Sequence, residues 1–210
     1  MSSIKRLAIC STASLSMMIF SARPAAAQMA TWNLDPEHTL ARFAVKHMMI
    51  ETVRGGFNKL SGSVQYDPND VTKTVIQTTI QTDSEESGSA GRDKDVKSPN
   101  FLDVEKFPTI TFQSKRVEPA GDGHTKVTGD LTIHGVTKEV VLDVDGPTKP
   151  LKVGKLIHVG ASTSLTINRK DYGMVYNRVL DTGGVMVSDE VALTLDIDMT
   201  QPAPAAGGPK

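Results

Sequence analysis

Apolar and polar residues alternate with a period of two along most of the chain from Thr31 onward, which is typical of β-strands with one buried face. The pattern is clear in eight stretches: 41–47, 60–66, 74–82, 109–113, 126–133, 139–145, 157–167 and 185–199. No long helical period separates them, so a parallel α/β sheet is not expected. The alternation predicts an all-β domain of consecutive antiparallel strands.

Turn residues separate many of these strands. Asp67-Pro68-Asn69-Asp70 and Gly121-Asp122-Gly123 are reverse-turn clusters, and Gly146-Pro147 ends a strand. Ile133-His134-Gly135-Val136 predicts a tight hairpin in which Gly135 takes a positive φ. Short links of this kind favour an antiparallel up-and-down barrel of about eight strands. Gly55-Gly56 is interpreted as a bulge or a bend, because two glycines fall far short of a phosphate-binding loop.

One polar segment, 83–103, interrupts the alternation. Ser98 followed by Pro99 resembles an N-cap and a first helical residue, so one short helix is expected to begin there. At the other end of the chain, residues 201–210 (QPAPAAGGPK) are rich in Pro, Ala and Gly, and they predict a disordered tail.

The first 27 residues are typical of a signal peptide. Lys5 and Arg6 form a basic start, 7–20 are mostly apolar, and Ala25-Ala26-Ala27 provides small residues for cleavage. The apolar run is too short and too often interrupted for a comfortable membrane span. We therefore expect residues 1–27 to be removed, residues 28–200 to form the barrel, and the protein to be exported without stable membrane insertion.

The composition of the remaining chain excludes several functions. Cys10 is the only cysteine and lies in the signal peptide, so thiol catalysis and thiolate metal sites are not expected. Removal of residues 1–27 takes away three of the 23 basic residues and leaves 20 against 24 acidic ones, a net charge of −4. No basic run is present, so a nucleic-acid partner is not expected. Ser-His-Asp motifs set off by a nucleophile elbow are also absent.

Several motifs in order resemble those of the YceI-like family. They are Trp32-Asn33-Leu34-Asp35 with Glu37-His38-Thr39, then Phe43-Ala44-Val45-Lys46-His47, Phe107-Pro108-Thr109-Ile110-Thr111-Phe112, the stretch 127–138 (VTGDLTIHGVTK) and Ile167-Asn168-Arg169-Lys170-Asp171-Tyr172-Gly173. The resemblance runs from about Trp32 to Met199. It implies a lipocalin-like barrel, usually periplasmic, whose interior holds a polyisoprenoid or similar long-chain lipid, in a binding or transport protein with no established catalytic residues.

The chain departs from the family pattern at one place. Relatives usually carry Arg-Asp-x-His-Leu before the short helix, whereas this chain has Arg92-Asp93-Lys94-Asp95-Val96. A role of that histidine at the cavity entrance cannot be transferred, and a different head group is compatible with the change.

A barrel of about eight strands either fills its interior with side chains or holds one small ligand. Small residues on the inward face, such as Gly62, Gly129 and Ala161, leave volume, but alternation alone does not separate a ligand-holding barrel from two packed sheets with a filled core. If a ligand binds, the expected lining residues are aromatic, apolar or imidazole side chains on the inward faces. They are Phe43, Val45, His47, Phe57, Phe101, Phe107, Phe112, Leu131, Ile133 and Ile167.

Polar contacts to a ligand have fewer candidates. Arg169, Asp171 and Tyr172 could grip a head group, or Arg169 and Asp171 could pair on the rim. His47 is either a hydrogen-bonded interior histidine or a head-group contact, and His134 is expected to serve its hairpin. The histidine spacings match no metal motif, so neither a metal site nor a cofactor is expected.

Three functional hypotheses remain open at this point. The first is a periplasmic carrier or reservoir for an isoprenoid-like lipid, without enzymatic activity. The second is an enzyme acting on a bound lipid through His47 or Arg169, and the third is an interaction module with a filled core. The sequence leaves a dimer open as the oligomeric state.

Overall fold

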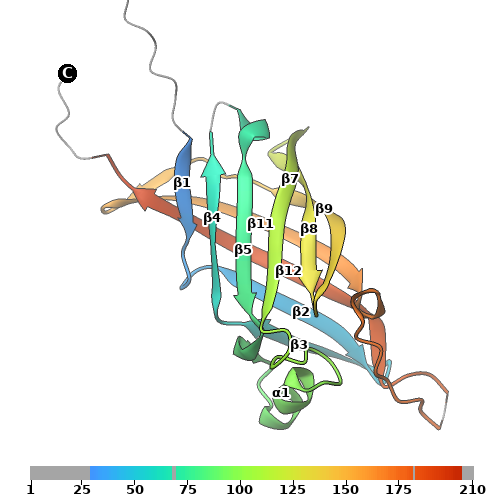
Figure 1. Ribbon diagram of the computed structural model, residues 1–210. Coiled ribbons are helices and arrows are strands. Elements are labelled where there is room, and N and C mark those ends of the chain that lie inside the picture. Colours follow the sequence, from blue (N-terminus) through green and yellow to red (C-terminus); the bar gives the residue numbers. More distant parts are fainter. Residues whose placement is uncertain (1–28, 68–69, 182, 205–210) are drawn as a thin grey trace, which may run out of the picture.

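The strands form one continuous antiparallel sheet that closes on itself (Figure 1). A computed structural model describes residues 29–67, 70–181 and 183–204. The strands are β1 Ala30–Leu34, β2 Leu40–His47, β3 Glu51–Phe57, β4 Leu60–Tyr66, β5 Val75–Gln81, β6 Glu85–Glu86, β7 Thr109–Gly121, β8 His124–Ile133, β9 Val136–Asp145, β10 Leu151–Val153, β11 Leu156–Asn168 and β12 Val187–Pro202. The helices are α1 Ala90–Lys97 and the 3₁₀ segments Val71–Lys73, Thr82–Ser84 and Arg169–Tyr172.

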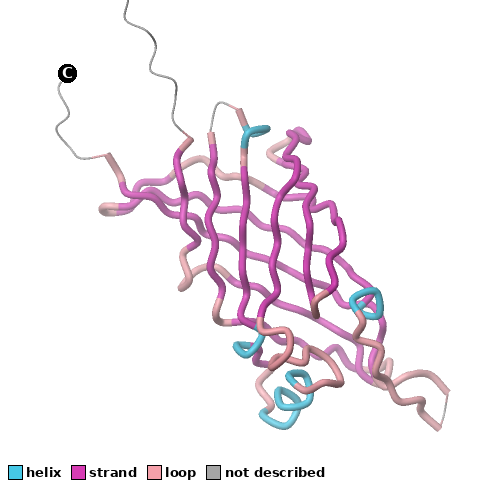
Figure 2. Tube along the Cα trace, in the orientation of Figure 1, coloured by secondary structure: helices cyan, strands magenta, loops and turns pink. Residues whose placement is uncertain are grey.

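Eight of the strands make a closed ring. From β4 onward, β4, β5, β7, β8, β9, β11 and β12 pair in chain order, and β1 lies between β12 and β4. Pairing of β11 with β12 along 156–168 and 190–202 completes the ring. The front strands β4, β5, β7 and β8 cross the rear strands β11, β12 and β2 at a large angle (Figure 2). The predicted all-β antiparallel barrel of about eight strands with one short α-helix is confirmed.

The first three strands break the simple up-and-down order. β1 and β2 lie along the same edge of β12, because β1 pairs at Met199–Thr200 and β2 pairs over Val187–Asp196. β3 then extends the sheet beyond β2, and the two-residue β6 pairs with the end of β3. The ring is therefore completed by β1 at one end, while β2 and β3 widen the barrel wall at the end that carries α1 (Figure 1).

The helix begins earlier than predicted. α1 spans Ala90–Lys97, and Ser98 is its C-cap rather than an N-cap. The Ser98 hydroxyl donates to the carbonyl of Asp95 and accepts from the amide of Asn100, so it stabilises the turn that follows the helix. The Ser-Pro pattern was therefore wrong as a helix start, because the same hydroxyl can also close a turn.

Gly55 and Gly56 also differ from their interpretation as a bulge. Both lie in β3, in an unbroken ladder opposite Phe43 and Arg42 of β2. A Cβ on Gly55 would lie 2.4 Å from the Phe43 ring. Glycine is therefore needed at this position so that the ring can pack against β3. The Ile133–Val136 hairpin is confirmed, with φ of 51° at His134 and 74° at Gly135.

The ends of the chain fall partly outside the described residues. The predicted signal peptide, 1–27, and residues 205–210 lie outside them. The predicted tail boundary at 201 is too early, because Gln201 and Pro202 belong to β12 and pair with Ile157 and Leu156 of β11. Among the described residues, no helix combines the length and the apolar character needed to cross a membrane.

Candidate binding cavity

The barrel interior holds two adjoining cavities. The inner cavity has a volume of about 160 Å³ and the outer cavity, next to α1, about 610 Å³. They share four lining residues, Phe57, Ile110, Ile133 and Leu193, and so adjoin at these side chains. Small-molecule sites have volumes of about 300–1,000 Å³. A core filled by its own side chains, one of the two alternatives left open by the sequence, is therefore not what the structure shows.

Apolar side chains from the ring strands form nearly all of the inner cavity. Examples from different strands are Leu34, Val64, Ile76, Val127, Val140 and Met199. Two of its threonines, Thr125 and Thr163, donate their hydroxyl protons to backbone carbonyls at 2.9 and 2.7 Å. Because these two hydroxyls are already bonded and most of the wall is apolar, the cavity offers water few partners.

The outer cavity has polar groups that the inner one lacks. α1 contributes Arg92 and Asp95, β2 contributes His47, and the segment before β12 contributes Asn177 and Arg178. Together with Arg169, three arginines and one aspartate line this cavity, so its polar wall carries a net positive charge at neutral pH. The barrel interior is thus apolar at one end and amphipathic at the end covered by α1.

His47 is the predicted lining residue with the most available polar atoms. Within the described part of the chain, its imidazole makes no hydrogen bond, although the side chain lines the outer cavity. A hydrogen-bonded interior histidine, the first of the two predicted roles, would have a protein partner. The arrangement favours the second role, a polar contact for a ligand.

Arg169 lies at the wall of the outer cavity but is only 2% exposed. Its guanidinium donates to the backbone carbonyls of Met174 and Ser188, the latter at 3.0 Å, and pairs with Asp189 at 3.4 Å. Burial lowers the pKa of Arg169, and the charge of Asp189 opposes this shift. The side chain therefore holds the 174–188 segment against the end of β11, and its protons are already committed to that segment.

α1 is fixed to the segment before it by one serine. Arg92 donates from Nε to the Ser87 hydroxyl and from Nη2 to the Ser87 carbonyl, both at 2.7 Å. The carboxylate of Asp93 accepts from the Ser87 amide at 2.9 Å. Asp95, at the position where the family motif predicts a histidine, lines the cavity and accepts from the Asn100 side chain at 3.1 Å.

Glu85 lies in β6, against which α1 packs. It is 1% exposed, and neither of its carboxylate oxygens has a hydrogen-bond partner among the residues that the structure describes. Burial raises the pKa of Glu85 to about 7, the charge of Asp93 adds to the shift, and Lys97 and Arg92 oppose it. Glu85 lines neither cavity, and the charged groups that shift its pKa include Asp93, Lys97 and Arg92 of α1.

The structure distributes the predicted lining residues between the two cavities. Phe43, Val45, His47, Phe101 and Ile167 line the outer cavity, Phe112 and Leu131 line the inner one, and Phe57 and Ile133 line both. Phe107 lines neither. Its ring lies 4.2 Å from the His134 ring and directly beneath Gly135, so Phe107 packs on the β8–β9 turn instead.

The predicted head-group residues are not brought together. Arg169 lines the outer cavity, but Asp171 and Tyr172 do not; Asp171 is exposed, and Tyr172 is buried in the core with Leu102. Arg169 pairs with Asp189 rather than with Asp171, which corrects the predicted rim pair. His134 reaches beyond its hairpin, because its Nδ1 lies 3.2 Å from the Tyr172 carbonyl.

Sequence reasoning missed most of the polar groups of the outer cavity. Asn177 and Arg178 lie in the irregular segment before β12, where no periodic pattern indicates an inward direction. Asp95 could have been suspected from the sequence, because it stands where the family motif predicts a histidine. Arg92 belongs to the same motif, and its place in the cavity follows from the position of α1.

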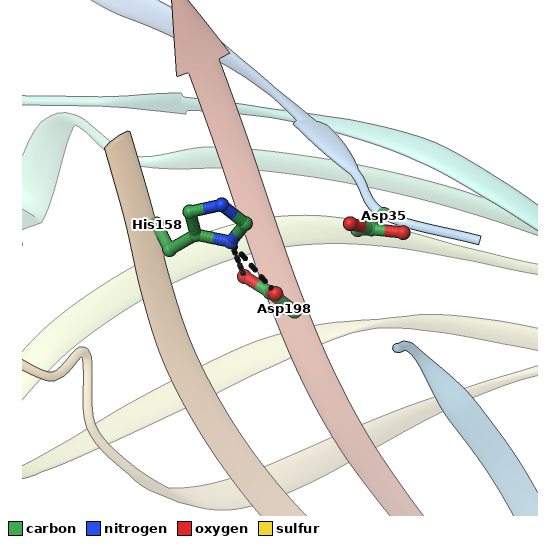
Figure 3. A group of neighbouring side chains, drawn as sticks. All are labelled: Asp35, His158 and Asp198. Carbon is green, nitrogen blue, oxygen red and sulfur yellow. Dashed lines mark hydrogen bonds and ion pairs between the residues drawn. The ribbon is translucent and has the colours of Figure 1, made fainter. Parts of the chain in front are cut away.

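A separate polar group lies on the outer face of the barrel. Asp35, His158 and Asp198 come from three neighbouring parts of the sheet, and one potential ligand atom from each lies within 4.8 Å of the others (Figure 3). Nδ1 of His158 is 2.9 Å from Asp198 Oδ2. No sequence spacing indicated this group, because its members are joined only by strand pairing.

Comparison with known proteins agrees with the barrel and its motifs. A sequence model of the YceI-like domain matches residues 32–199. The chain belongs to the YceI-like family. Among curated relatives of this YceI-like chain, the UPF0312 proteins SA2479 and SAV2687 of Staphylococcus aureus are each 36% identical over 170 residues, which cover 78% of this chain and 93% of each relative.

Solved structures share the YceI-like fold. BcnA of Burkholderia cenocepacia is 26% identical with a TM-score of 0.66, covering 80% of this chain and 99% of BcnA. A YceI protein of Campylobacter jejuni is 27% identical with a TM-score of 0.59, covering 76% and 90%. A polyisoprenoid binding domain from Saccharophagus degradans is 17% identical with a TM-score of 0.59, covering 82% and 98%, and at this identity it shows the fold alone.

Proposed function

We propose that this chain is a periplasmic carrier or reservoir that binds a long-chain apolar lipid of the isoprenoid type inside its barrel. The observation that carries the proposal is the pair of adjoining cavities, one nearly all apolar and one with a polar wall. A lipid lies with its chain toward the inner cavity and its polar end near His47, Arg92 and Arg178. The polyisoprenoid binding domain from Saccharophagus degradans, which has the same fold, adds support.

The energetics suit an uncharged chain. Each buried methylene contributes about 0.8 kcal/mol, so a chain of some twenty methylene equivalents gains roughly 16 kcal/mol before the costs of association. Ordering the chain and losing its translational freedom offset a large part of this gain. Tight binding therefore does not require an ion pair. The polar wall of the outer cavity mainly determines which head group the protein binds.

The hydrogen bonds and the ion pair of Arg169 favour a binding function over a catalytic one. Arg169 is one of the two groups on which the enzyme hypothesis depends, yet its guanidinium donates to the carbonyls of Met174 and Ser188 and pairs with Asp189. A group held this way stabilises the cavity wall and has little freedom to serve a reacting atom.

The test uses Leu193, which lines both cavities. Leu193→Trp places a large ring where the two cavities adjoin, and Thr194→Trp places the same ring on the exposed face of the same strand. We expect native mass spectrometry of protein purified from a bacterial periplasm to show an extractable long-chain lipid on the wild type and on Thr194→Trp. Leu193→Trp should carry much less. A lipid-free mass for the wild type, or equal lipid on both variants, would contradict the proposal.

A further inference from the structure

The outward-facing group at the barrel seam has a geometry that the lipid cavity does not explain. Cavity-lining residues Leu34, Ala161 and Met199 face inward, and alternation therefore directs the side chains of Asp35, His158 and Asp198 to the outer face. β12 is the middle strand: Asp35 continues the β1 ladder opposite Asp198, and His158 lies on β11, on the other side of β12. The amide of Asp35 donates to the carbonyl of Asp198 at 2.8 Å, which fixes this register.

Two carboxylates therefore face each other across adjacent strands. Like charges directly opposite in a sheet are destabilising. Within the described ranges, no lysine or arginine forms an ion pair with Asp35 or Asp198; their ion-pair partners are His38 and His158. Asp35 and Asp198 are also only 19% and 22% exposed, so water screens their repulsion less than it would on an open surface. A cation between them would remove this repulsion.

The donor set is that of a divalent transition-metal site. Zn²⁺ binds imidazole nitrogen and carboxylate oxygen, and its ligand atoms lie about 2.0–2.2 Å from the ion, hence about 3.4 Å from one another in a tetrahedron. Nδ1 of His158 lies 2.9 and 3.2 Å from the two oxygens of Asp198, which is already close to that spacing. The full group spans at most 4.8 Å, so a modest side-chain rotation at Asp35 completes three ligands.

The outer face leaves the group accessible. The side chains of Asp35, His158 and Asp198 keep 19%, 24% and 22% of their surface exposed. Solvent molecules can therefore supply the remaining coordination positions. We infer that Asp35, His158 and Asp198 form a binding site for a divalent transition-metal ion of the zinc class.

This site would lie where the barrel ring closes. β1 and β12 share only two registered pairs, Asn33↔Thr200 and Leu34↔Met199, directly beside the metal ligands. An ion held by side chains of β1, β11 and β12 would fasten this short junction. Binding should therefore stabilise the folded barrel, because a ligand that binds only the folded state raises its stability by mass action.

The experiment adds Zn²⁺ to tag-free, EDTA-treated full-length mature protein and measures both binding by calorimetry and the unfolding temperature. We expect one equivalent of Zn²⁺ to bind and Tm to rise by about 5 °C or more at roughly 100-fold excess over Kd. Co²⁺ should give the visible absorption of a low-coordinate nitrogen and oxygen site. Asp198→Asn and His158→Gln should each weaken Zn²⁺ binding by about tenfold or more.

A matched control comes from the same chain. His124 and Asp143 form another surface pair, with 3.1 Å between Nδ1 and Oδ1, but they do not belong to a group of three ligands among the described residues. His124→Gln should keep Zn²⁺ affinity within about threefold of the wild type. No Zn²⁺ binding by the wild type, or retained binding in both Asp198→Asn and His158→Gln, would overturn the inference.

Discussion

The inner and outer cavities share one barrel but are built in different ways. The inner cavity is enclosed by the strands of the ring, and its wall consists mostly of apolar side chains that alternate with exposed ones. The outer cavity is enclosed partly by α1 and by the irregular segment between the last 3₁₀ turn and β12, and it collects the polar groups. The regular strands of the barrel thus provide the space for an apolar chain. The irregular segments provide the polar groups next to the end of that chain.

The two parts also depend on different forces. Burial of apolar side chains holds the inner wall, and its stabilising free energy is spread over many side chains. The outer wall depends on a few polar contacts, Arg169 to the carbonyls before β12 and Ser87 to the first turn of α1. Removal of one such contact should therefore disturb the outer cavity much more than removal of one methyl group disturbs the inner one.

The largest expected effect is at Arg169. Arg169→Ala leaves the carbonyls of Met174 and Ser188 without their donor, and we expect a loss of about 3–5 kcal/mol in the free energy of unfolding. Lys170→Ala is the control, because Lys170 pairs with the same Asp189 at 2.9 Å but is 44% exposed. It should cost less than about 1 kcal/mol. Urea denaturation of both variants measures the difference, and equal losses would show that the outer wall does not depend on the buried guanidinium.

The same contrast explains what the sequence could predict. Alternation placed Leu131, Ile133 and Phe112 in the interior, because strand periodicity alone decides which face a side chain takes. It could not place Arg178, whose position depends on how Arg169 holds a non-periodic segment. It also could not bring Asp35 to Asp198, since their proximity follows from the pairing of the first and last strands. Motif resemblance supplied the closed barrel that alternation had left as one of two alternatives.

A second prediction concerns the buried carboxyl next to α1. The pKa of Glu85 is raised from an ordinary value of 4.5 to about 7 in the folded protein. Between these two values the folded state holds a proton that the unfolded state has lost, so the stability falls as the pH rises through this window. The stabilising contribution is complete below about pH 4.5 and lost above about pH 7, a change on the order of 3 kcal/mol.

Glu85→Gln tests this assignment, because glutamine keeps the shape and removes the charge. The variant should be more stable than the wild type at pH 8, and the difference should shrink toward zero as the pH falls to 5. Glu86→Gln changes the exposed neighbour in β6 and retains Glu85, so it is the control and should keep the pH dependence of the wild type. Thermal unfolding across this pH range measures both. A Glu85→Gln profile parallel to the wild type would mean that Glu85 does not carry the proton.

The smallest expected effect concerns the specificity of the two cavities, one for the head group and one for the chain of a bound lipid. Among the described residues, Asp95 is the one acidic side chain that lines the outer cavity, so Asp95→Asn removes that charge, while Ala161→Phe adds volume only to the inner cavity wall. We expect Asp95→Asn to raise the affinity for a prenyl phosphate about two- to fivefold over the prenyl alcohol of equal length, since the remaining charges lie in partly screened surroundings. Ala161→Phe should leave that ratio unchanged and shift preference toward shorter chains. Competition binding with lipids of two lengths and two head groups measures both ratios, and a change of head-group preference in Ala161→Phe would show that the two cavities do not act separately.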